Sequence, residues 1–336
     1  MTVSGFRKAG AAILGLMVML AVAADFVAVN PPARQFSDFV YAPPMPPRIV
    51  DGNGRWRLPF VYPLRLDNRL ERRFLEDREH PMPLRMMQGS LVSADSRAGG
   101  PWFPLGTDAL GRDVLARLVS GARLSLGLAF LAAAGALLLG SVVGAVAGYA
   151  GGALDEVLMR VADFVIALPA IYVVLALRAA APLVLTTAEI FWIMVSVFVL
   201  VGWPIAARGV RAVISAERAR EYAEAARAAG ATSARLLLRH LLPATCGLLA
   251  AHATLLVPAF ILAEATLSFV GLGFGEPAAS WGLMLQEAGR GRALAEAPWL
   301  LAPAGAIALL VLAVNLVAPR AISEVSALGR SYKAHL

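Results

Sequence analysis

The residue types that carry enzyme chemistry are present in this chain, but they lack the spacing that a catalytic or metal site needs. The four histidines (His80, His240, His252 and His335) are scattered, and the single cysteine, Cys246, excludes an intrachain disulfide and a cysteine-based metal cluster. There is no Gly-x-x-x-x-Gly-Lys-Ser/Thr loop for ATP phosphates, no Gly-x-Ser-x-Gly elbow and no His-Glu-x-x-His pair. The sequence therefore predicts no catalytic residue, no metal site and no cofactor.

Two acids stand inside long apolar stretches, where a charge is costly unless it faces protein or water. Asp163 and Glu264 are each expected to line a translocation path, where they would meet an ammonium group, or to serve helix packing. Asp163 follows Arg160 by three residues and would pair with it at the membrane edge. Glu264 would bond a neighbouring helix or a partner subunit. We favour the structural role for both, and we assign Pro169, as a kink, and Ser268 to the same two roles.

The composition indicates that these acids belong to a membrane protein. Of the 336 residues 59% are hydrophobic and only 16% are charged, and the mean hydropathy is +0.69. A water-exposed surface would not accommodate so much apolar sequence. The net charge of +7 does not indicate nucleic-acid binding, because the basic residues stand mostly between apolar runs instead of forming one basic face.

Six apolar stretches approach the roughly 20 residues that a spanning helix needs. We place them near residues 9–29, 124–150, 158–181, 187–207, 246–271 and 298–319, which predicts an all-α, polytopic helical bundle. The first stretch follows Arg7 and Lys8 and is equally compatible with a cleavable signal peptide. Gly140, Gly144 and Gly148 have the small-xxx-small spacing that allows close helix packing.

The distribution of basic residues predicts the orientation. The loop 208–243 holds seven arginines against three glutamates, and the N-terminus and the tail 321–336 are also basic. Because basic loops stay on the cytoplasmic side, we expect both termini and this loop in the cytoplasm of a cell with an inner membrane. Residues 1–30 would form an N-terminal span and 122–320 a core of five spans.

The hydrophilic segment 31–121 would then lie in the periplasm. It contains thirteen arginines, ten acids and many prolines, and we interpret it as an elaborated loop too small for an independent enzyme domain. Its stretch 65–79 is a candidate helix. Residues 108–121 form an amphipathic pattern that we expect to be a helix along the outer membrane surface.

The cytoplasmic loop has the clearest local pattern. Residues 221–229 are rich in alanine, the best helix former, and Gly230 is placed to end that helix in a left-handed conformation. Thr232 or Ser233 would cap a second short helix, which Pro243 would close before the next span. Taken alone, this helix–glycine–helix unit is as compatible with an inert connector as with a docking element.

The same residues resemble the signature loop of the binding-protein-dependent ABC transporter permeases. Glu224-Ala225-Ala226, then Gly230, then Leu242-Pro243 stand at the spacing of that family, and Arg239-His240 resembles its dipeptide/oligopeptide branch. The resemblance implies that the loop is a coupling helix that seats on a separate ATPase. It implies this role for Glu221, Glu224, Ala225, Ala226, Arg227, Gly230, Arg239, His240, Leu242 and Pro243.

Further stretches resemble the same branch, so that the resemblance covers roughly residues 104–315. They are Gly106-Thr107-Asp108, Gly111-Arg112-Asp113, the run from Glu264 to Gly273, and Ser280-Trp281-Gly282. The long segment 31–100 and a tail without the usual Gly-Asp-Gly pattern depart from the family, which leaves the substrate open.

The resemblance also implies the partners and the mechanism. It implies the permease fold of type I ABC importers, a second permease subunit in a heterodimer, two ATPase subunits that hydrolyse ATP, a periplasmic substrate-binding protein and surrounding membrane lipid. Transport of dipeptides or oligopeptides would proceed by alternating access. Two alternatives remain open at this point: an ion-coupled secondary transporter that uses Asp163 or Glu264, and a membrane-anchored scaffold without transport.

Overall fold

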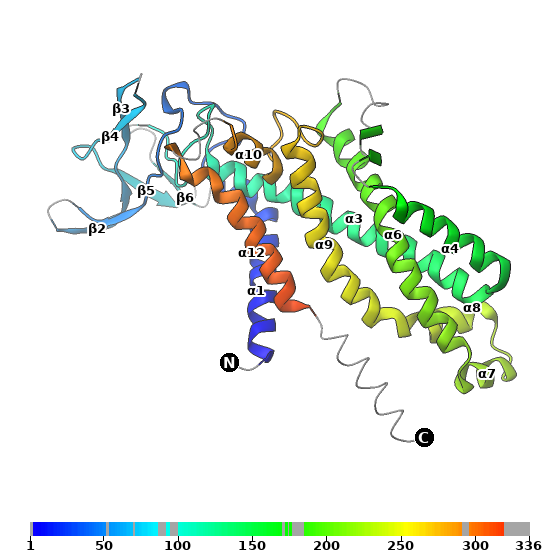
Figure 1. Ribbon diagram of the computed structural model, residues 1–336. Helices are drawn as coiled ribbons and strands as arrows, with labels where there is room; N and C mark the ends of the chain where they lie inside the picture. Colours follow the sequence, from blue (N-terminus) through cyan, green and yellow to red (C-terminus); the bar gives the residue numbers. More distant parts are fainter. Residues whose placement is uncertain are drawn as a thin grey trace. The chain divides into compact units, whose positions relative to one another are not determined.

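We describe the fold from a computed structural model of the chain (Figure 1). The structure describes residues 3–51, 54–69, 71–86, 92–94, 100–169, 172–173, 175–176, 185–290 and 296–318. The predicted tail 321–336 lies outside these residues. The chain divides into two compact units, one of residues 1–11, 128–261 and 311–336, the other of residues 12–127 and 262–310.

The long helices follow the apolar stretches of the sequence. They are α1 (Val3–Val22), α3 (Val114–Ala150), α4 (Gly152–Ala167), α6 (Thr187–Arg218), α9 (Cys246–Phe269) and α12 (Ala302–Val317). Within the described ranges, five helical segments are long and apolar enough to cross a membrane: Gly5–Val22, Val114–Ala150, Thr187–Arg218, Ser233–Phe269 and Pro298–Val317. Five of the six predicted spans therefore have a counterpart.

The third predicted span, 158–181, is met only in part. Helix α4 ends at Ala167, and its C-cap Leu168 is extended with ψ 117°. A residue before proline is sterically pushed out of the helical region, which explains the end of the helix before Pro169. Pro169 therefore ends α4 instead of kinking it. Much of the remaining stretch, including 177–181, lies outside the described residues.

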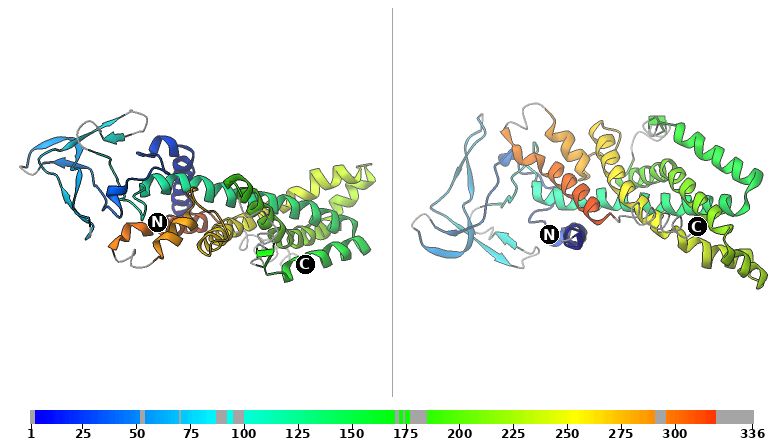
Figure 2. Two further views of the ribbon diagram at one scale, coloured as in Figure 1. Left: turned by 90° about the horizontal axis from the view of Figure 1, so that it is seen from above. Right: turned by 60° about the horizontal axis from the view of Figure 1, so that its bottom comes forward.

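In the first unit, helices α3, α4 and α6 pack through small residues. Figure 2 shows α4 beside α6 in both of its views. At Gly140, Gly144 and Gly148 of α3, an added Cβ would lie 2.7, 2.3 and 2.7 Å from the nearest atoms of α6. The predicted close helix packing at these glycines is therefore confirmed.

Short helices connect α6 to α9 in the same unit. They are α7 (Glu221–Ala228), α8 (Ser233–Leu236), a π-helical turn η3 (Leu237–Leu241) and a 3₁₀ turn η4 (Leu242–Thr245). Leu236 and Leu241 are both fully buried although they stand five residues apart, which matches the i→i+5 period of a π turn. Pro243 lies in the 3₁₀ turn, so the chain stays helical from Ser233 to Phe269 and does not close at the proline as expected.

The second unit contains a β module within the predicted periplasmic loop. Its strands are β1 (Arg48–Val50), β2 (Trp56–Val61), β3 (Leu64–Asn68), β4 (Arg73–Glu76), β5 (Met82–Met86) and β6 (Val92–Ala94). Strands β1, β2, β5 and β6 form an antiparallel sheet in the order β1-β2-β5-β6, and β3 pairs with β4. The candidate helix at 65–79 is therefore wrong: this stretch forms the β3–β4 hairpin.

The β module has a hydrophobic core of its own. Met45, Val61, Met82, Trp102 and Phe103 are buried together, and the indole N–H of Trp102 donates to the Met45 carbonyl at 2.9 Å. The segment is thus more than the elaborated loop that its composition indicated. The short helices α2 (Ala24–Val27) and η1 (Ser37–Phe39) precede these strands.

The amphipathic stretch 108–121 is not a separate surface helix. Residues 108–113 form a turn, and α3 begins at Val114. Gly111 takes a φ of +71°, and a Cβ there would lie 2.1 Å from the Phe36 carbonyl oxygen, so only glycine fits. The same unit contains α10 (Trp281–Ala288) and η5 (Pro298–Leu301).

Candidate coupling loop and charge cluster

In the coupling loop, residues 208–243, the helix-ending and helix-capping hydrogen bonds are made by residues that are close together in sequence. Helix α7 ends in a Schellman motif: the Gly230 N–H donates to the Arg227 carbonyl at 2.9 Å, and the Ala231 N–H to the Ala226 carbonyl at 3.0 Å. Gly230 has a φ of +83° with open space around it. The Thr232 hydroxyl then accepts from the Arg235 N–H at 3.3 Å and caps α8. The predicted helix–glycine–helix unit is confirmed.

One face of this unit packs against the helical core of the first unit. Ala223, Leu236 and Leu241 are fully buried with Ile214 and Val210 of α6. Nearby, the Tyr222 hydroxyl donates to Glu217 at 2.8 Å. Burial and this bond to a carboxylate raise the pKa of Tyr222. The buried face fixes where the loop stands against its own helices.

The other face is exposed and carries most of the residues singled out in the sequence. Within the coupling loop, Leu242 is half-buried and Ala226 faces the core in part, whereas the remaining predicted coupling residues are exposed: Glu221, Glu224, Ala225, Arg227, Gly230, Arg239, His240 and Pro243. Alanine and glycine allow close approach of a partner backbone, and the flanking charges supply directional contacts. This face therefore combines small residues with exposed charges, which are the features that a docking surface needs.

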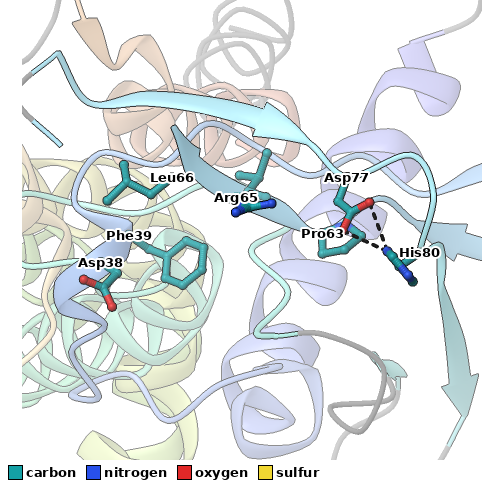
Figure 3. Close-up of a pocket in the computed structure, with 8 residues that line it drawn as sticks. Asp38, Phe39, Pro63, Arg65, Leu66, Asp77 and His80 are labelled. Carbon is teal, nitrogen blue, oxygen red and sulfur yellow. Dashed lines mark hydrogen bonds and ion pairs between the residues drawn. The ribbon is translucent and has the colours of Figure 1, made fainter. Parts of the chain in front are cut away.

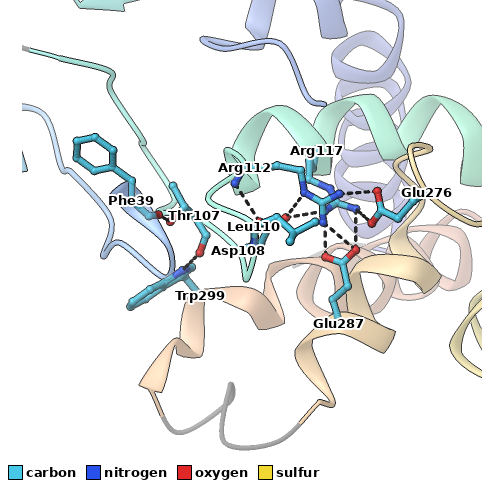
Figure 4. Close-up of polar contacts among 9 residues, drawn as sticks. All are labelled: Phe39, Thr107, Asp108, Leu110, Arg112, Arg117, Glu276, Glu287 and Trp299. Carbon is cyan, nitrogen blue, oxygen red and sulfur yellow. Dashed lines mark hydrogen bonds and ion pairs between the residues drawn. The ribbon is translucent and has the colours of Figure 1, made fainter. Parts of the chain in front are cut away.

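A second concentration of charge, in the other unit, is largely buried, although the Glu276 side chain is 47% exposed. The charge cluster consists of Asp108, Arg112, Arg117, Glu276 and Glu287 (Figure 4). The side chains of both arginines and of Asp108 are at most 3% exposed. Arg112 donates to Asp108 at 2.7 Å, to Glu276 at 2.5 Å and to Glu287 at 3.0 Å. Arg117 donates to Asp108 at 2.5 Å and to Glu287 at 2.9 Å.

The cluster joins the entry to α3 with the segment that precedes and forms α10. Burial raises the pKa of Glu287 to about 7, although the two arginines oppose this shift. The neighbouring Asp113 accepts the Leu115 and Ala116 N–H groups at the start of α3, and burial raises its pKa to about 6. Buried charges need partners, and each arginine here has at least two carboxylates.

Comparison with known proteins bears mainly on the coupling loop. The family model described as the inner membrane component of binding-protein-dependent transport systems matches residues 140–322, more than half of the chain. This chain belongs to that permease family. The match includes the coupling loop and Glu264 but not Arg112 or Arg117.

Individual relatives match this permease over more than half of both chains. A putative peptide permease of Brucella suis biovar 1 (strain 1330) is 40% identical over 217 residues, which is 64% of this chain and 69% of that protein. The oligopeptide transport system permease protein OppC of Bacillus subtilis (strain 168) is 38% identical over 217 residues, 64% and 68% of the two chains. The dipeptide transport system permease protein DppC of the same organism is 41% identical over 186 residues, 55% and 56% of the two chains.

In this permease Glu264 lies in the protein interior and is hydrogen-bonded there. It is fully buried and accepts from the Ser125 and Ser268 hydroxyls, both at 2.9 Å. The Trp281 N–H in turn donates to the Ser125 hydroxyl at 3.2 Å. An added Cβ at Gly282 would lie 2.7 Å from Ala265. The motif residues around Glu264, Ser280 and Trp281 therefore meet in one tightly packed region that holds α10 against α3 and α9.

Asp163 has a different partner from the one expected. It pairs with Arg208 of α6, while Arg160 pairs with Glu156 at 2.5 Å. The pairing with Arg160 was wrong because α6 runs alongside α4 and brings Arg208 to Asp163, and because the i,i+4 glutamate–arginine pair is the better intrahelical geometry. The ion-coupled alternative would use Asp163 or Glu264 as its ion site, and both already have protein partners.

Sequence reasoning missed Arg117, Glu276 and Glu287. The first two motifs of the branch, Gly106-Thr107-Asp108 and Gly111-Arg112-Asp113, marked one half of the cluster, but its partners stand more than 160 residues later. The usable signal was the pair of arginines five residues apart at the start of an apolar helix, since buried arginines require carboxylates.

Proposed function

We propose that this permease is the subunit of an ATP-driven importer for dipeptides or oligopeptides. The observation that carries the proposal is the exposed face of the coupling loop, where small residues flanked by charges would let a partner approach closely. The peptide cargo is supported by the names of the relatives, which are peptide, oligopeptide and dipeptide permeases.

The proposed assembly contains a second, similar permease subunit, two ATPase subunits and a periplasmic substrate-binding protein. Residues 221–243 would seat on the ATPase, and both termini would face the cytoplasm of a cell whose inner membrane the chain spans. The β module and the charge cluster would then face the periplasm. ATP-driven closure of the ATPases would move the loop and bias the helices between inward-open and outward-open states.

The decisive test replaces Gly230 with proline. Proline cannot adopt a φ of +83° and has no N–H for the Arg227 carbonyl, so G230P breaks the Schellman motif. We expect normal membrane insertion, loss of co-purifying ATPase and loss of ATP-driven peptide uptake. Insertion is followed by membrane fractionation, docking by affinity purification, and uptake in proteoliposomes with the binding protein present.

The matched control is Gly230→Asn. Asparagine tolerates the left-handed conformation and keeps the N–H donor, so docking should persist. Retained ATPase binding by G230P would remove the coupling assignment. Normal docking with uptake of a non-peptide cargo would remove only the peptide assignment.

A further inference from the structure

The β module contains a pocket that the coupling mechanism does not use. It has a volume of about 520 Å³ and is lined by Asp38, Phe39, Pro63, Leu64, Arg65, Leu66, Asp77 and His80. Figure 3 shows Asp38 and Phe39 at one end, Asp77 and His80 at the other, and Arg65 between them. This volume is within the range of small-molecule sites.

Some charged groups that line this pocket have hydrogen-bond partners in the protein, and others do not. Asp77 accepts from His80 Nδ1 at 3.1 Å, and Asp38 accepts from Arg69 through its Oδ1 atom. Within the part of the chain that the structure describes, the Arg65 guanidinium has no hydrogen bond or ion pair, and Asp38 Oδ2 has no donor. The pocket therefore presents one unpaired guanidinium and one free carboxylate oxygen.

The pocket also has apolar lining residues, among them Phe39, Leu64 and Leu66. The Phe39 ring is fixed by stacking on Phe74 at 6.3 Å and by a tilted contact with Phe103 at 5.4 Å. Leu66 pairs with Phe74 across the β3–β4 hairpin. An arginine fork binds a carboxylate in a bidentate manner, and the apolar lining suits a hydrocarbon side chain next to it.

We propose that this pocket is a binding site for a short zwitterionic peptide. The C-terminal carboxylate would bind Arg65, an apolar side chain of the peptide would lie on Phe39, and the ammonium would bind Asp38 Oδ2. The proposal rests on the proposed peptide cargo, and it adds a capture site on the permease itself, separate from the binding protein and from the translocation path. A binding-protein carboxylate is the competing occupant, but it would leave Asp38 Oδ2 unused.

The test uses the full-length permease with its partner subunit in lipid nanodiscs, without ATP or binding protein. The probes are radiolabelled alanyl-phenylalanine and its C-terminal amide, which lacks the carboxylate. We expect Arg65→Ala to weaken dipeptide binding at least tenfold, because a charged bidentate contact is lost. The amide should bind the wild type as weakly as the dipeptide binds R65A, and R65A should not distinguish the two probes.

The matched control is Arg73→Ala, an exposed arginine of the same hairpin that does not line the pocket. It should bind the dipeptide like the wild type, which separates the pocket from peptide bound elsewhere in the permease. Equal binding of dipeptide and amide, unchanged binding by R65A, or no dipeptide binding to the wild type would each overturn the proposal.

Two further measurements separate this site from its rivals. If R65A leaves dipeptide binding intact but weakens binding of the substrate-binding protein, the pocket takes a protein carboxylate and the peptide site is wrong. ATP-driven dipeptide uptake with saturating binding protein is measured in parallel. Normal uptake without pocket binding would overturn the pocket alone, whereas absent uptake of any peptide by the wild type would overturn the proposed function.

Discussion

The coupling loop and the charge cluster both concentrate acids and arginines, but they treat those charges in opposite ways. In the loop, Glu221, Glu224 and Arg227 are exposed, and the fold is held by caps, a glycine turn and buried leucines. In the cluster, Arg112 and Arg117 are almost fully buried, and the fold depends on their carboxylates. An exposed charged side chain contributes little to stability and can pair with another protein, whereas a buried one needs an internal partner and affects the stability of the fold.

The largest effect expected from this difference follows removal of a buried arginine. Arg117→Ala would leave Asp108 and Glu287 with fewer positive partners inside the protein, and breaking a buried ion pair costs about 3–5 kcal/mol. We expect a marked fall in the melting temperature of the detergent-solubilised protein. Arg160→Ala, which breaks an exposed pair with Glu156, should cost less than about 1 kcal/mol. Equal losses of stability in the two variants would refute the distinction between buried and exposed charges.

The second prediction concerns the pH dependence of the cluster. Because the pKa of Glu287 rises from 4.5 to about 7 on folding, the folded protein binds a proton that the unfolded chain has released. The contribution of this group to stability is therefore full below about pH 4.5 and is lost as the pH rises through about 7. Glu287→Gln removes this contribution, so the fall in melting temperature between pH 5 and pH 8 should become smaller.

The groups that face Glu287 remain in that variant: Arg112, Arg117, Asp108 and Glu276. Asp113, whose pKa is also raised, adds a slope of the same sign in both proteins. Glu71→Gln at an exposed position is the control and should leave the slope unchanged. A slope that E287Q does not reduce would contradict the assignment of the titrating group.

The smallest effect on stability is expected in the loop. Glu224 is exposed and makes no ion pair within the described residues, so Glu224→Lys should change the unfolding free energy by less than about 1 kcal/mol, mainly through the dipole of α7. Its effect on ATPase docking should be at least tenfold and should depend on salt concentration, because an exposed contact is screened. Glu71→Lys, on the β module, should leave docking unchanged.

The same difference explains what the sequence could predict. The loop was predictable because each signal acts within a few residues: alanines favour the helix, Gly230 ends it, and Thr232 begins the next. The apolar spans were predictable for the same reason. The cluster was not, because Arg117 and Glu287 are 170 residues apart and no local pattern records that they meet.

The β3–β4 hairpin shows a different kind of failure. The charged stretch from residue 65 was interpreted as a candidate helix, but Leu64, Arg65, Leu66 and Asp67 alternate between apolar and charged residues. Alternation with a period of two is typical of a half-buried strand. The signal was therefore present but short, and charge content received more weight than periodicity. The pocket around Arg65 depends on this hairpin and was not foreseen for that reason.

The π turn before α9 determines how that helix is rotated about its axis relative to the coupling loop. The chain is helical from Ser233 to Phe269, and the turn at Leu237–Leu241 inserts one residue beyond the regular helical repeat. One residue corresponds to a rotation of about 100° in an α-helix. The turn thus sets the rotation of α9 about its own axis relative to the two buried leucines, Leu236 and Leu241. Deleting one residue there would rotate α9, so that a different set of its side chains would point toward the neighbouring helices.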